Sequence, residues 1–279
     1  MENELNIPNA LLSRLTNVAS LAALKAGEIL KKGFGSTFEI TSKEGKHNLV
    51  TDYDKFSEES ILTQIKGVFP EHAFICEESG KQNYKEDSII WVIDPLDGTV
   101  NFAHNIPCFS ISIAAMFKGK VLSAVVYNPM LNELFTAEDG HGAFLNGSRL
   151  SVTKTDLLSN AIAATGFPYN TYENPLHCIE HFTYMAKLGI PLRRMGSAAL
   201  DLAYLAAGRY DAFWEVSLNS WDYAAGMLLI EEAGGVMTNF VGESYHKIQE
   251  GPILASNGLI HEQLIDHFKH TYDDESPKT

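Results

Sequence analysis

The sequence has 279 residues, of which 45% are hydrophobic and 20% charged, and this composition is typical of a globular protein with a large core. Its 21 basic and 35 acidic side chains give a formal net charge of −14, which disfavours a broad nucleic-acid-binding face. The three cysteines, Cys76, Cys108 and Cys178, are far apart and form no CxxC pair, so we expect reduced thiols and a cytoplasmic protein. There is no signal-peptide pattern at the start and no apolar run of 18 residues, so we expect no membrane association.

The first third of the chain is predicted to be mainly helical. Apolar side chains recur at helical spacing over residues 10–33, and Gly33 closes that helix. Three elements follow, a short strand at Phe38–Ile40, a polar loop at Ser42–His47 and a second helix over 54–68. Asp52 or Asp54 is expected to cap the second helix, because aspartate accepts hydrogen bonds from the first free N–H groups.

Two strands are predicted next. The first covers residues 73–79, where an apolar run leads into the acidic pair Glu77 and Glu78, and a polar loop over 80–88 follows. The second is the apolar run Ile89–Ile93, which is typical of a buried strand. We expect it to end at Asp94-Pro95, since proline has no N–H group to donate to a sheet.

The residues after that strand carry the clearest chemical signal in the chain. Asp94 and Asp97 lie three positions apart, and carboxylates this close repel each other unless a cation lies between them. Oxygen ligands favour hard cations such as Mg²⁺, commonly with a phosphate group as the remaining ligand. Gly98 lets the backbone approach a ligand, and the N–H groups after it can receive an anion. The same residues also fit a solvated Asp-Pro…Asp-Gly turn, so both interpretations stay open on these residues alone.

The pattern changes near residue 150. Strands at 109–117, 121–127 and 133–137, with a tight turn at Asn146-Gly147, predict an antiparallel meander. From about residue 156, short strands alternate with helices predicted at 174–188, 197–207, 220–233 and 259–270. We therefore expect an α+β half over 1–150 and an α/β half over 151–279, packed as one body, with a disordered tail over 271–279.

The segment from Asp94 to Phe102 reads DPLDGTVNF and resembles the DPxDGTxNF signature of the inositol monophosphatase family. Members of that family are Mg²⁺-dependent, lithium-sensitive phosphatases with a layered αβαβα fold, the fold shared with fructose-1,6-bisphosphatase. Four other segments also resemble the family, namely NLVTDYD at 48–54, CEES at 76–79, GSAA at 196–199 and WDYAAG at 221–226. One departure is Cys76, which replaces the glycine of the family's GEES and would restrict the backbone beside Glu77.

The resemblance implies a role for each matching residue. Two or three Mg²⁺ ions would be held by Glu77, Asp94, the Leu96 carbonyl, Asp97 and Asp222. Thr99, polarised by Asp54, would orient the attacking water, and Glu77 would take part in catalysis through its metal. The substrate would contact the N–H groups of Gly98 and Thr99, together with Ala198, Glu215 and Asp222. From the residues alone, Asp54 and Asp222 are explained as carboxylates at helix starts and Glu215 as the polar end of a strand.

The resemblance therefore predicts hydrolysis of a phosphate monoester, with myo-inositol 1-phosphate converted to inositol and phosphate by a homodimer. Alternative substrates within the family are fructose 1,6-bisphosphate, histidinol phosphate and a 3′-phosphonucleotide. A different class of function is a binding partner of the transcription machinery, as some bacterial members are, with catalysis secondary and no direct contact with nucleic acid. A third alternative, a catalytically silent interaction protein, is disfavoured by the intact set Glu77, Asp94, Asp97, Thr99 and Asp222.

Overall fold

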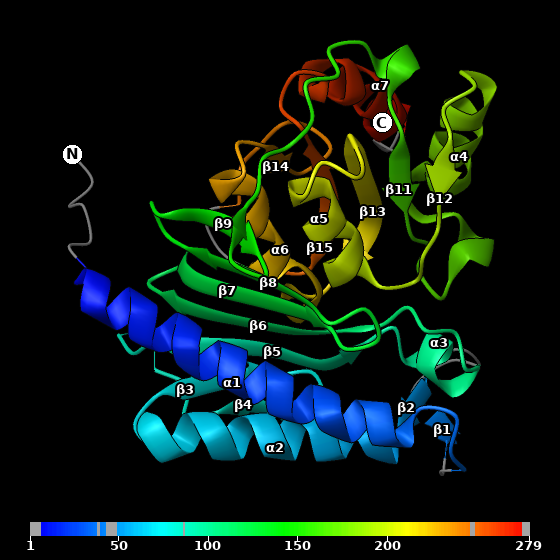
Figure 1. The fold of residues 1–279 in the computed structure, drawn as a ribbon. Helices are drawn as coiled ribbons and strands as arrows, with labels where there is room; N and C mark the ends of the chain where they lie inside the picture. Colours follow the sequence, from blue (N-terminus) through cyan, green and yellow to red (C-terminus); the bar gives the residue numbers. More distant parts are fainter. Residues whose placement is uncertain (1–6, 38–39, 43–48, 86, 246–248, 275–279) are drawn as a thin grey trace.

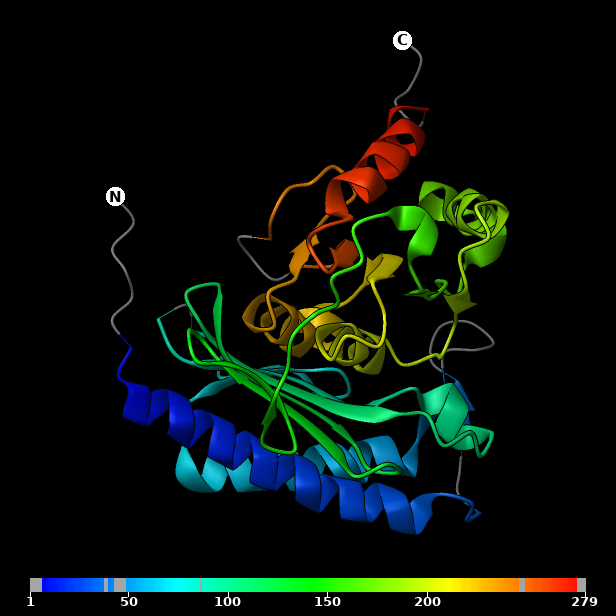
Figure 2. The same ribbon diagram turned by 45° about the horizontal axis from the view of Figure 1, so that its top comes forward.

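The computed structural model of the protein describes residues 7–37, 40–42, 49–85, 87–245 and 249–274. Helices and sheets alternate in five layers (Figures 1 and 2), which confirms the predicted αβαβα sandwich. The first layer is formed by α1 (Asn9–Gly33) and α2 (Asp52–Val68), and the middle layer by α5 (Ala198–Ala206) and α6 (Ser220–Glu232). The outer layer on the far side is formed by α4 (Cys178–Lys187) and α7 (His261–Asp274).

The larger sheet lies between the first helix pair and the middle one. Its eight strands are, in spatial order, β10 (Ser148–Arg149), β9 (Gly142–Leu145), β8 (Glu133–Glu138), β7 (Lys120–Asn128), β6 (Ser110–Phe117), β5 (Ile90–Asp97), β3 (Ala73–Cys76) and β4 (Gly80–Gln82). Neighbours from β10 to β5 are antiparallel, which confirms the predicted meander. The strand β4 was not predicted, because residues 80–88 are polar throughout and β4 lies at the sheet edge.

The smaller sheet lies between the middle helix pair and the outer one. Its strands are, in spatial order, β12 (Leu192–Arg193), β11 (Ala163–Thr165), β13 (Ala212–Leu218), β15 (Gly251–Ser256) and β14 (Val236–Thr238). The remaining short elements are β1 (Ile40–Ser42), β2 (Leu49–Thr51), α3 (Thr99–Ala103), η1 (Leu158–Asn160), η2 (Thr171–Glu173) and η3 (Pro175–His177). The two sheets lie on either side of residue 150, and the division of the chain into two halves at that point stays a prediction.

The core consists of apolar clusters between the layers. Trp91 and Ile93 of β5 point toward α1 and α2, whereas Val92 points toward the middle helices, because successive side chains of a strand alternate between its faces. Both faces of β5 are thus covered, and this is why its sequence is continuously apolar. All three cysteines are buried and free of disulfides. No helix in the described ranges is both long and apolar enough to span a bilayer.

The predicted end of the strand at Asp94-Pro95 was wrong. Strand β5 continues to Asp97, and its register against β6 shifts between the two aspartates, so that the pairs are Asp94 with Ser112 and Asp97 with Ser110. Three steps along β5 match two steps along β6, which is a β-bulge with one extra residue. Pro95 lies in this bulge, where its missing N–H group interrupts no regular pairing.

Several predicted boundaries also differ from the structure. Helix α2 begins at Asp52, and its N-cap is Thr51 rather than Asp52 or Asp54. Helix α7 runs to Asp274, so the first four residues of the predicted disordered tail are helical, and residues 275–279 lie outside the described ranges. Residues 38–39 of the predicted first strand and residues 43–47 of the predicted polar loop also lie outside the described ranges.

Candidate active site

The bulge at the end of β5 carries the two aspartates of the central segment. Asp94 is 2% exposed, and its Oδ1 accepts a hydrogen bond from the N–H of Leu96 at 3.0 Å. The carbonyl of Pro95 accepts a hydrogen bond of 2.7 Å from the hydroxyl of Ser57, a buried residue of α2. Helix α2 therefore fixes the backbone between the two carboxylates.

Gly98 follows Asp97 and is the N-cap of α3. Its φ of 98° lies in the left-handed region, and a Cβ there would be 3.1 Å from the carbonyl oxygens of both Cys108 and Gly196. Only glycine meets both conditions without strain. The N–H groups at this turn belong to the first positions of a helix, where no intrahelical acceptor exists. The contact of Gly98 and Thr99 with a phosphate group stays a prediction.

Thr99 and Asp54 are hydrogen-bonded, with the Thr99 hydroxyl donating to Oδ1 of Asp54 at 2.9 Å. Asp54 is fully buried, and its Oδ2 accepts from both the N–H and the hydroxyl of Thr51, at 2.7 and 2.6 Å. Burial raises the pKa of Asp54 to about 7 against the opposing effect of these hydrogen bonds. The carboxylate is therefore rigidly held and titrates close to neutral pH.

The four carboxylates predicted to bind metal lie in one electrostatic neighbourhood. Burial raises the pKa of Asp94 well above its ordinary value, and the charges of Glu77, Asp97 and Asp222 raise it further. Burial likewise raises the pKa of Asp222, with the charges of Asp97 and Glu77 acting in the same direction. The protein thus gathers carboxylates from β5, from α6 and from the end of β3, and the charges of their neighbours make Asp94 and Asp222 harder to ionise.

Hydrogen bonds hold the carboxylate of Asp222 and the backbone of Glu77. Oδ2 of Asp222 accepts the N–H of Asn219 at 2.7 Å, in the first turn of α6, as expected for an aspartate at a helix start. The N–H of Glu77 donates to the carbonyl of Ile93 at 3.1 Å, which extends the parallel pairing of β3 and β5 by one residue. Each residue thus has a structural role beside its predicted metal-binding role.

The chemistry of these donors fits a hard divalent cation. All of them are carboxylate or carbonyl oxygens, and a cation would relieve the repulsion that raises the pKa values of Asp94 and Asp222. Within the ranges that the structure describes, no group of three or more His, Cys, Asp or Glu side chains is placed so that it could hold a metal ion. Metal binding at Glu77, Asp94, Leu96, Asp97 and Asp222 therefore stays a prediction.

Asp97 connects the large sheet to the middle helix layer. Its Oδ2 accepts hydrogen bonds from the hydroxyl of Ser197 at 2.6 Å and from the N–H of Ala199 at 2.8 Å, at the start of α5. The hydroxyl of Ser110 contributes a longer bond of 3.5 Å. Burial raises the pKa of Asp97 to about 6, and these bonds oppose the shift. Ser197 was not predicted from the sequence, because its partner is 100 residues away.

The predicted substrate contacts lie on the elements around Asp97. Ala198 is the first residue of α5 and is partly exposed. Glu215 lies on β13, and its carboxylate packs so closely on Gly166 that a Cβ there would be 2.2 Å from Oε2. Burial raises the pKa of Glu215 to about 8, with the charges of Asp201 and Asp97 adding to the effect and Arg194 opposing it.

Asp201 is a further acidic residue that was not predicted from the sequence. It is 1% exposed on α5, and its Oδ1 has no hydrogen-bond partner among the described residues. Burial and the charge of Asp97 raise its pKa well above the ordinary value. The one available signal is that it is the only charged position in the otherwise apolar segment of α5.

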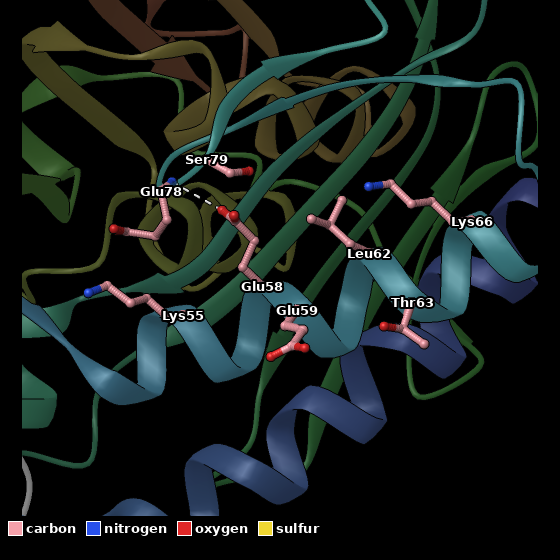
Figure 3. A pocket seen from close by; sticks show the side chains of 8 residues that line it. All are labelled: Lys55, Glu58, Glu59, Leu62, Thr63, Lys66, Glu78 and Ser79. Atoms are coloured by element: carbon pink, nitrogen blue, oxygen red, sulfur yellow. Dashed lines mark hydrogen bonds between the residues drawn. The ribbon is translucent and has the colours of Figure 1, made fainter.

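A groove of about 400 Å³ runs along α2 beside the turn that follows Glu77 (Figure 3). It is lined by Lys55, Glu58, Glu59, Leu62, Thr63, Lys66, Glu78 and Ser79. The dashed line in Figure 3 marks the hydrogen bond of 3.0 Å from the N–H of Glu78 to Oε2 of Glu58, a buried carboxylate. Glu58 thus anchors the turn after Glu77, whereas the residues that line the groove include none of the predicted metal ligands.

Comparison with known proteins identifies the family and supports the fold. The profile of the inositol monophosphatase family matches residues 11–272, a range that includes every predicted site residue. The chain belongs to the inositol monophosphatase family. This confirms the resemblance seen in DPLDGTVNF, and it supports a phosphatase as the general class of activity.

Relatives of this inositol monophosphatase family member include proteins with two kinds of name. The chain is 41% identical over 261 residues to the Nus factor SuhB of Escherichia coli strain K12. The aligned region covers 93% of this chain and 97% of the relative. A solved structure of the extragenic suppressor protein SuhB from Bartonella henselae has a TM-score of 0.84 and 37% identity, covering 92% of this chain and 98% of the other. The inositol monophosphatase from Anabaena has a TM-score of 0.80 and 36% identity, covering 96% and 98%.

Cys76 is the position where this family member departs from the expected motif. Its side chain is fully buried in the cluster between the first helix layer and the large sheet. Its backbone is not among those with positive φ in the described ranges, so the position does not require glycine. The expected restriction beside Glu77 therefore introduces no backbone strain.

Proposed function

We propose that the protein is a Mg²⁺-dependent phosphatase that hydrolyses a phosphate monoester, with myo-inositol 1-phosphate as its substrate. The observation that carries the proposal is a group of four carboxylates, in which the charges of Glu77 and Asp97 raise the pKa values of Asp94 and Asp222, beside the hydrogen-bonded pair Thr99 and Asp54. Family membership supports the phosphatase activity, and the name of the Anabaena relative supports the choice of inositol phosphate.

The carboxylates Glu77, Asp94, Asp97 and Asp222, with the carbonyl of Leu96, would hold two or three Mg²⁺ ions. Bound Mg²⁺ would supply stabilisation of the negative charge that develops on the phosphate and on the leaving oxygen. The protein contributes the fixed positions of these ligands, through the bulge in β5 and the first turn of α6.

Thr99, hydrogen-bonded to Asp54, would orient the attacking water. Because Thr51 fixes the carboxylate of Asp54, Oδ1 of Asp54 can accept a hydrogen bond from the hydroxyl of Thr99. The oxygen of Thr99 is then free to accept a hydrogen bond from water and so to orient its attack. The N–H groups of Gly98 and Thr99 would bind the phosphate oxygens, and Glu77 would act in catalysis only through its metal.

The alcohol part of the substrate would lie against Ala198 and Glu215, with Asp222 at the boundary between sugar and metal. A carboxylate that accepts hydrogen bonds from ring hydroxyls favours a polyol over an apolar alcohol. Fructose 1,6-bisphosphate, histidinol phosphate and a 3′-phosphonucleotide are the competing substrates, and a comparison of rates across this panel distinguishes them.

The direct test is phosphate release by the purified protein with Mg²⁺ and with EDTA. Asp94→Asn should lower the rate by at least about 10²-fold, because charge stabilisation at the reacting phosphate is lost. Asp87→Asn is the matched control, since the Asp87 side chain is 89% exposed and remote from the proposed ligands. Full activity in EDTA, or wild-type turnover by Asp94→Asn, would contradict the proposal.

A second function is favoured by the 41% identity to a Nus factor. We propose that the protein also binds a component of the transcription machinery, with catalysis secondary in that role. Tagged wild type and Asp94→Asn should both enrich RNA polymerase or its associated factors from a lysate of the source organism. Absence of these proteins from both pull-downs would contradict this role and leave the phosphatase proposal intact.

We further propose that the protein acts as a cytoplasmic homodimer. The three free, buried thiols are consistent with a reducing compartment. The dimer follows from the family resemblance, and sedimentation at micromolar concentration tests it, since a single monomeric species would contradict it.

A further inference from the structure

The side-chain amide of Asn101, on α3, joins backbone segments that are far apart in the sequence. Its Nδ2 donates to the carbonyl of Cys108 at 2.7 Å and to the carbonyl of Met195 at 2.7 Å, and it lies 3.5 Å from the carbonyl of Gly196. Because carbonyl oxygens only accept, the amide nitrogen must face them, and its two hydrogens serve two separate segments.

The backbone around this amide is packed too closely for side chains. Gly196 has a φ of 82°, and a Cβ there would lie 3.1 Å from Nδ2 of Asn101. A Cβ at Gly98 would lie 3.1 Å from the carbonyl oxygen of Gly196. The turn between β5 and α3 is therefore in direct contact with the segment that leads into α5, and the Asn101 amide joins the two.

The same segment contacts Asp97 immediately afterwards. Ser197 and Ala199 donate to Oδ2 of Asp97 at 2.6 and 2.8 Å. The segment 195–199 is thus held at its start by Asn101 of α3 and at its end by Asp97, the last residue of β5. Met195 is only two residues from Ser197, whose hydroxyl is bonded to the carboxylate of Asp97.

We propose that Asn101 is a positioning residue that fixes the position of the start of α5 relative to Asp97, without touching metal or substrate itself. This inference rests on the proposed function, because Asp97 and Ala198 matter only if metal and substrate bind there. Residues that orient metal ligands from behind commonly affect affinity or activity by about 10- to 100-fold when they are replaced.

The test replaces the amide by a group of the same shape that cannot donate. Asn101→Asp directs an oxygen at two carbonyl oxygens, so we expect Mn²⁺ affinity, measured by calorimetry, to fall about tenfold or more, with a matching fall in kcat/KM. The ratio of mutant to wild-type activity should recover as the pH is lowered, because a protonated aspartate can donate again. Asn101→Ala should also lose affinity but show no such recovery.

Asn257→Asp is the matched control. Asn257 is 3% exposed, and its Nδ2 also donates to two acceptors, Thr153 Oγ1 and the Thr155 carbonyl, both at 2.8 Å. It lies between β15 and α7, away from the site, so its replacement should lower thermal stability while Mn²⁺ affinity and kinetics stay unchanged. The control therefore separates a loss of stability from a loss of positioning.

The outcomes distinguish this inference from the proposed function. Wild-type Mn²⁺ affinity and kinetics in both Asn101 variants would overturn the role of Asn101 and leave the phosphatase proposal standing. If Asn101→Asp fails to fold, Asn101→Ala decides alone, since it removes the donors without bringing oxygens together. A wild-type protein that neither binds Mn²⁺ nor releases phosphate would overturn the proposed function itself.

Discussion

Thr99 has one hydroxyl proton and two acceptors within reach, Oδ1 of Asp54 at 2.9 Å and the carbonyl of Leu96 at 3.0 Å. A hydroxyl donates one hydrogen, so the two acceptors compete for it. When the proton points to Asp54, the Leu96 carbonyl is left for the proposed ion, and the Thr99 oxygen presents its lone pairs to water. The arrangement therefore links proton position to metal coordination at a single side chain.

The first prediction concerns this hydroxyl. Thr99→Ala keeps every proposed carboxylate ligand, so the Mg²⁺ concentration for half activation should change little, while kcat falls by roughly 10²–10⁴. Thr99→Ser is the control, because it retains the hydroxyl and should keep most of the rate. A Thr99→Ala protein that needs far more Mg²⁺ but keeps its saturated kcat would show that Thr99 serves the metal instead.

The second prediction concerns Glu215, whose raised pKa of about 8 means that its carboxylate is fully ionised only above that pH. Glu215→Gln keeps the shape and removes the charge, and a charge-assisted hydrogen bond is worth about 1.5–3 kcal/mol. We expect kcat/KM for myo-inositol 1-phosphate to fall roughly ten- to hundredfold at pH 9 and much less at pH 7, where the Glu215 side chain is itself mostly neutral.

The comparison substrate for Glu215→Gln is 2-glycerophosphate, which lacks the ring hydroxyls and should be affected much less. Equal losses on both substrates at both pH values would indicate that Glu215 supports the fold, which its tight packing on Gly166 also permits.

From the sequence alone, candidate site residues are easiest to predict where they lie close together along the chain. Asp94, Asp97 and Thr99 share one segment, so their spacing suggested a site, although a solvated turn fits the same residues. Ser197 and Asn101 were not identified as partners, because each bonds a residue about 100 positions away. Such contacts depend on how α5 is placed against β5, and no local pattern encodes that placement.

At the scale of elements, long or strongly periodic segments were predicted well, whereas some of the short ones were not. The helix expected over 10–33 is α1, because its apolar face repeats over many turns. The strands β4 and β10, which were not predicted, have three and two residues, too few for any periodicity to appear. Strand β5 was predicted too short, because Pro95 reads as a strand end unless the bulge that accommodates it is known.

The third prediction concerns the turn between β5 and α3. Gly98→Ala places a Cβ 3.1 Å from two backbone oxygens at a φ of 98°, so the free energy of unfolding should fall by about 1–3 kcal/mol. Gly140→Ala is the control, because Gly140 also has positive φ, at 75°, but has open space around its Cβ position. Urea denaturation of both variants separates the close contact from the backbone conformation, and equal losses would show that the contact costs nothing.

At the scale of the whole molecule, the site is assembled from three successive layers. Asp54 comes from α2 in the first helix layer, Asp94 and Asp97 come from the large sheet, and Asp222 comes from α6 in the middle helix layer. The middle helices are apolar on nearly every side, as expected for helices between two sheets. This is why the sequence predicted α5 and α6 as helices but, apart from the resemblance, gave no indication of which sheet each covers.

The fourth prediction concerns metal removal and pH. Asp94, Asp97 and Asp222 have raised pKa values and bind protons more tightly in the folded state than in the unfolded state. Without metal, stability should therefore be greatest near pH 4 and be lost as pH rises through the folded pKa values, which is about 6 for Asp97. Thermal unfolding in EDTA at pH 5 and pH 7.5 measures this loss, and Mg²⁺ should restore stability at the higher pH.

In the same experiment, Asp94→Asn should raise the melting temperature of the metal-free protein at pH 7.5, because it removes one of the repelling charges. Asp87→Asn should leave the melting temperature unchanged. A lower melting temperature for Asp94→Asn would contradict the repulsion argument, because the asparagine oxygen can still accept the hydrogen bond from the N–H of Leu96.

The gathering of carboxylates also has a consequence for the life of the protein in a cell. A chain whose native state contains unrelieved repulsion spends more time unfolded, and unfolded chains are removed by proteases. A cation that binds only the native state would shift this balance in proportion to its free concentration. Magnesium starvation would then deplete the protein as well as slow it, and pulse proteolysis across a range of Mg²⁺ concentrations would reveal that dependence.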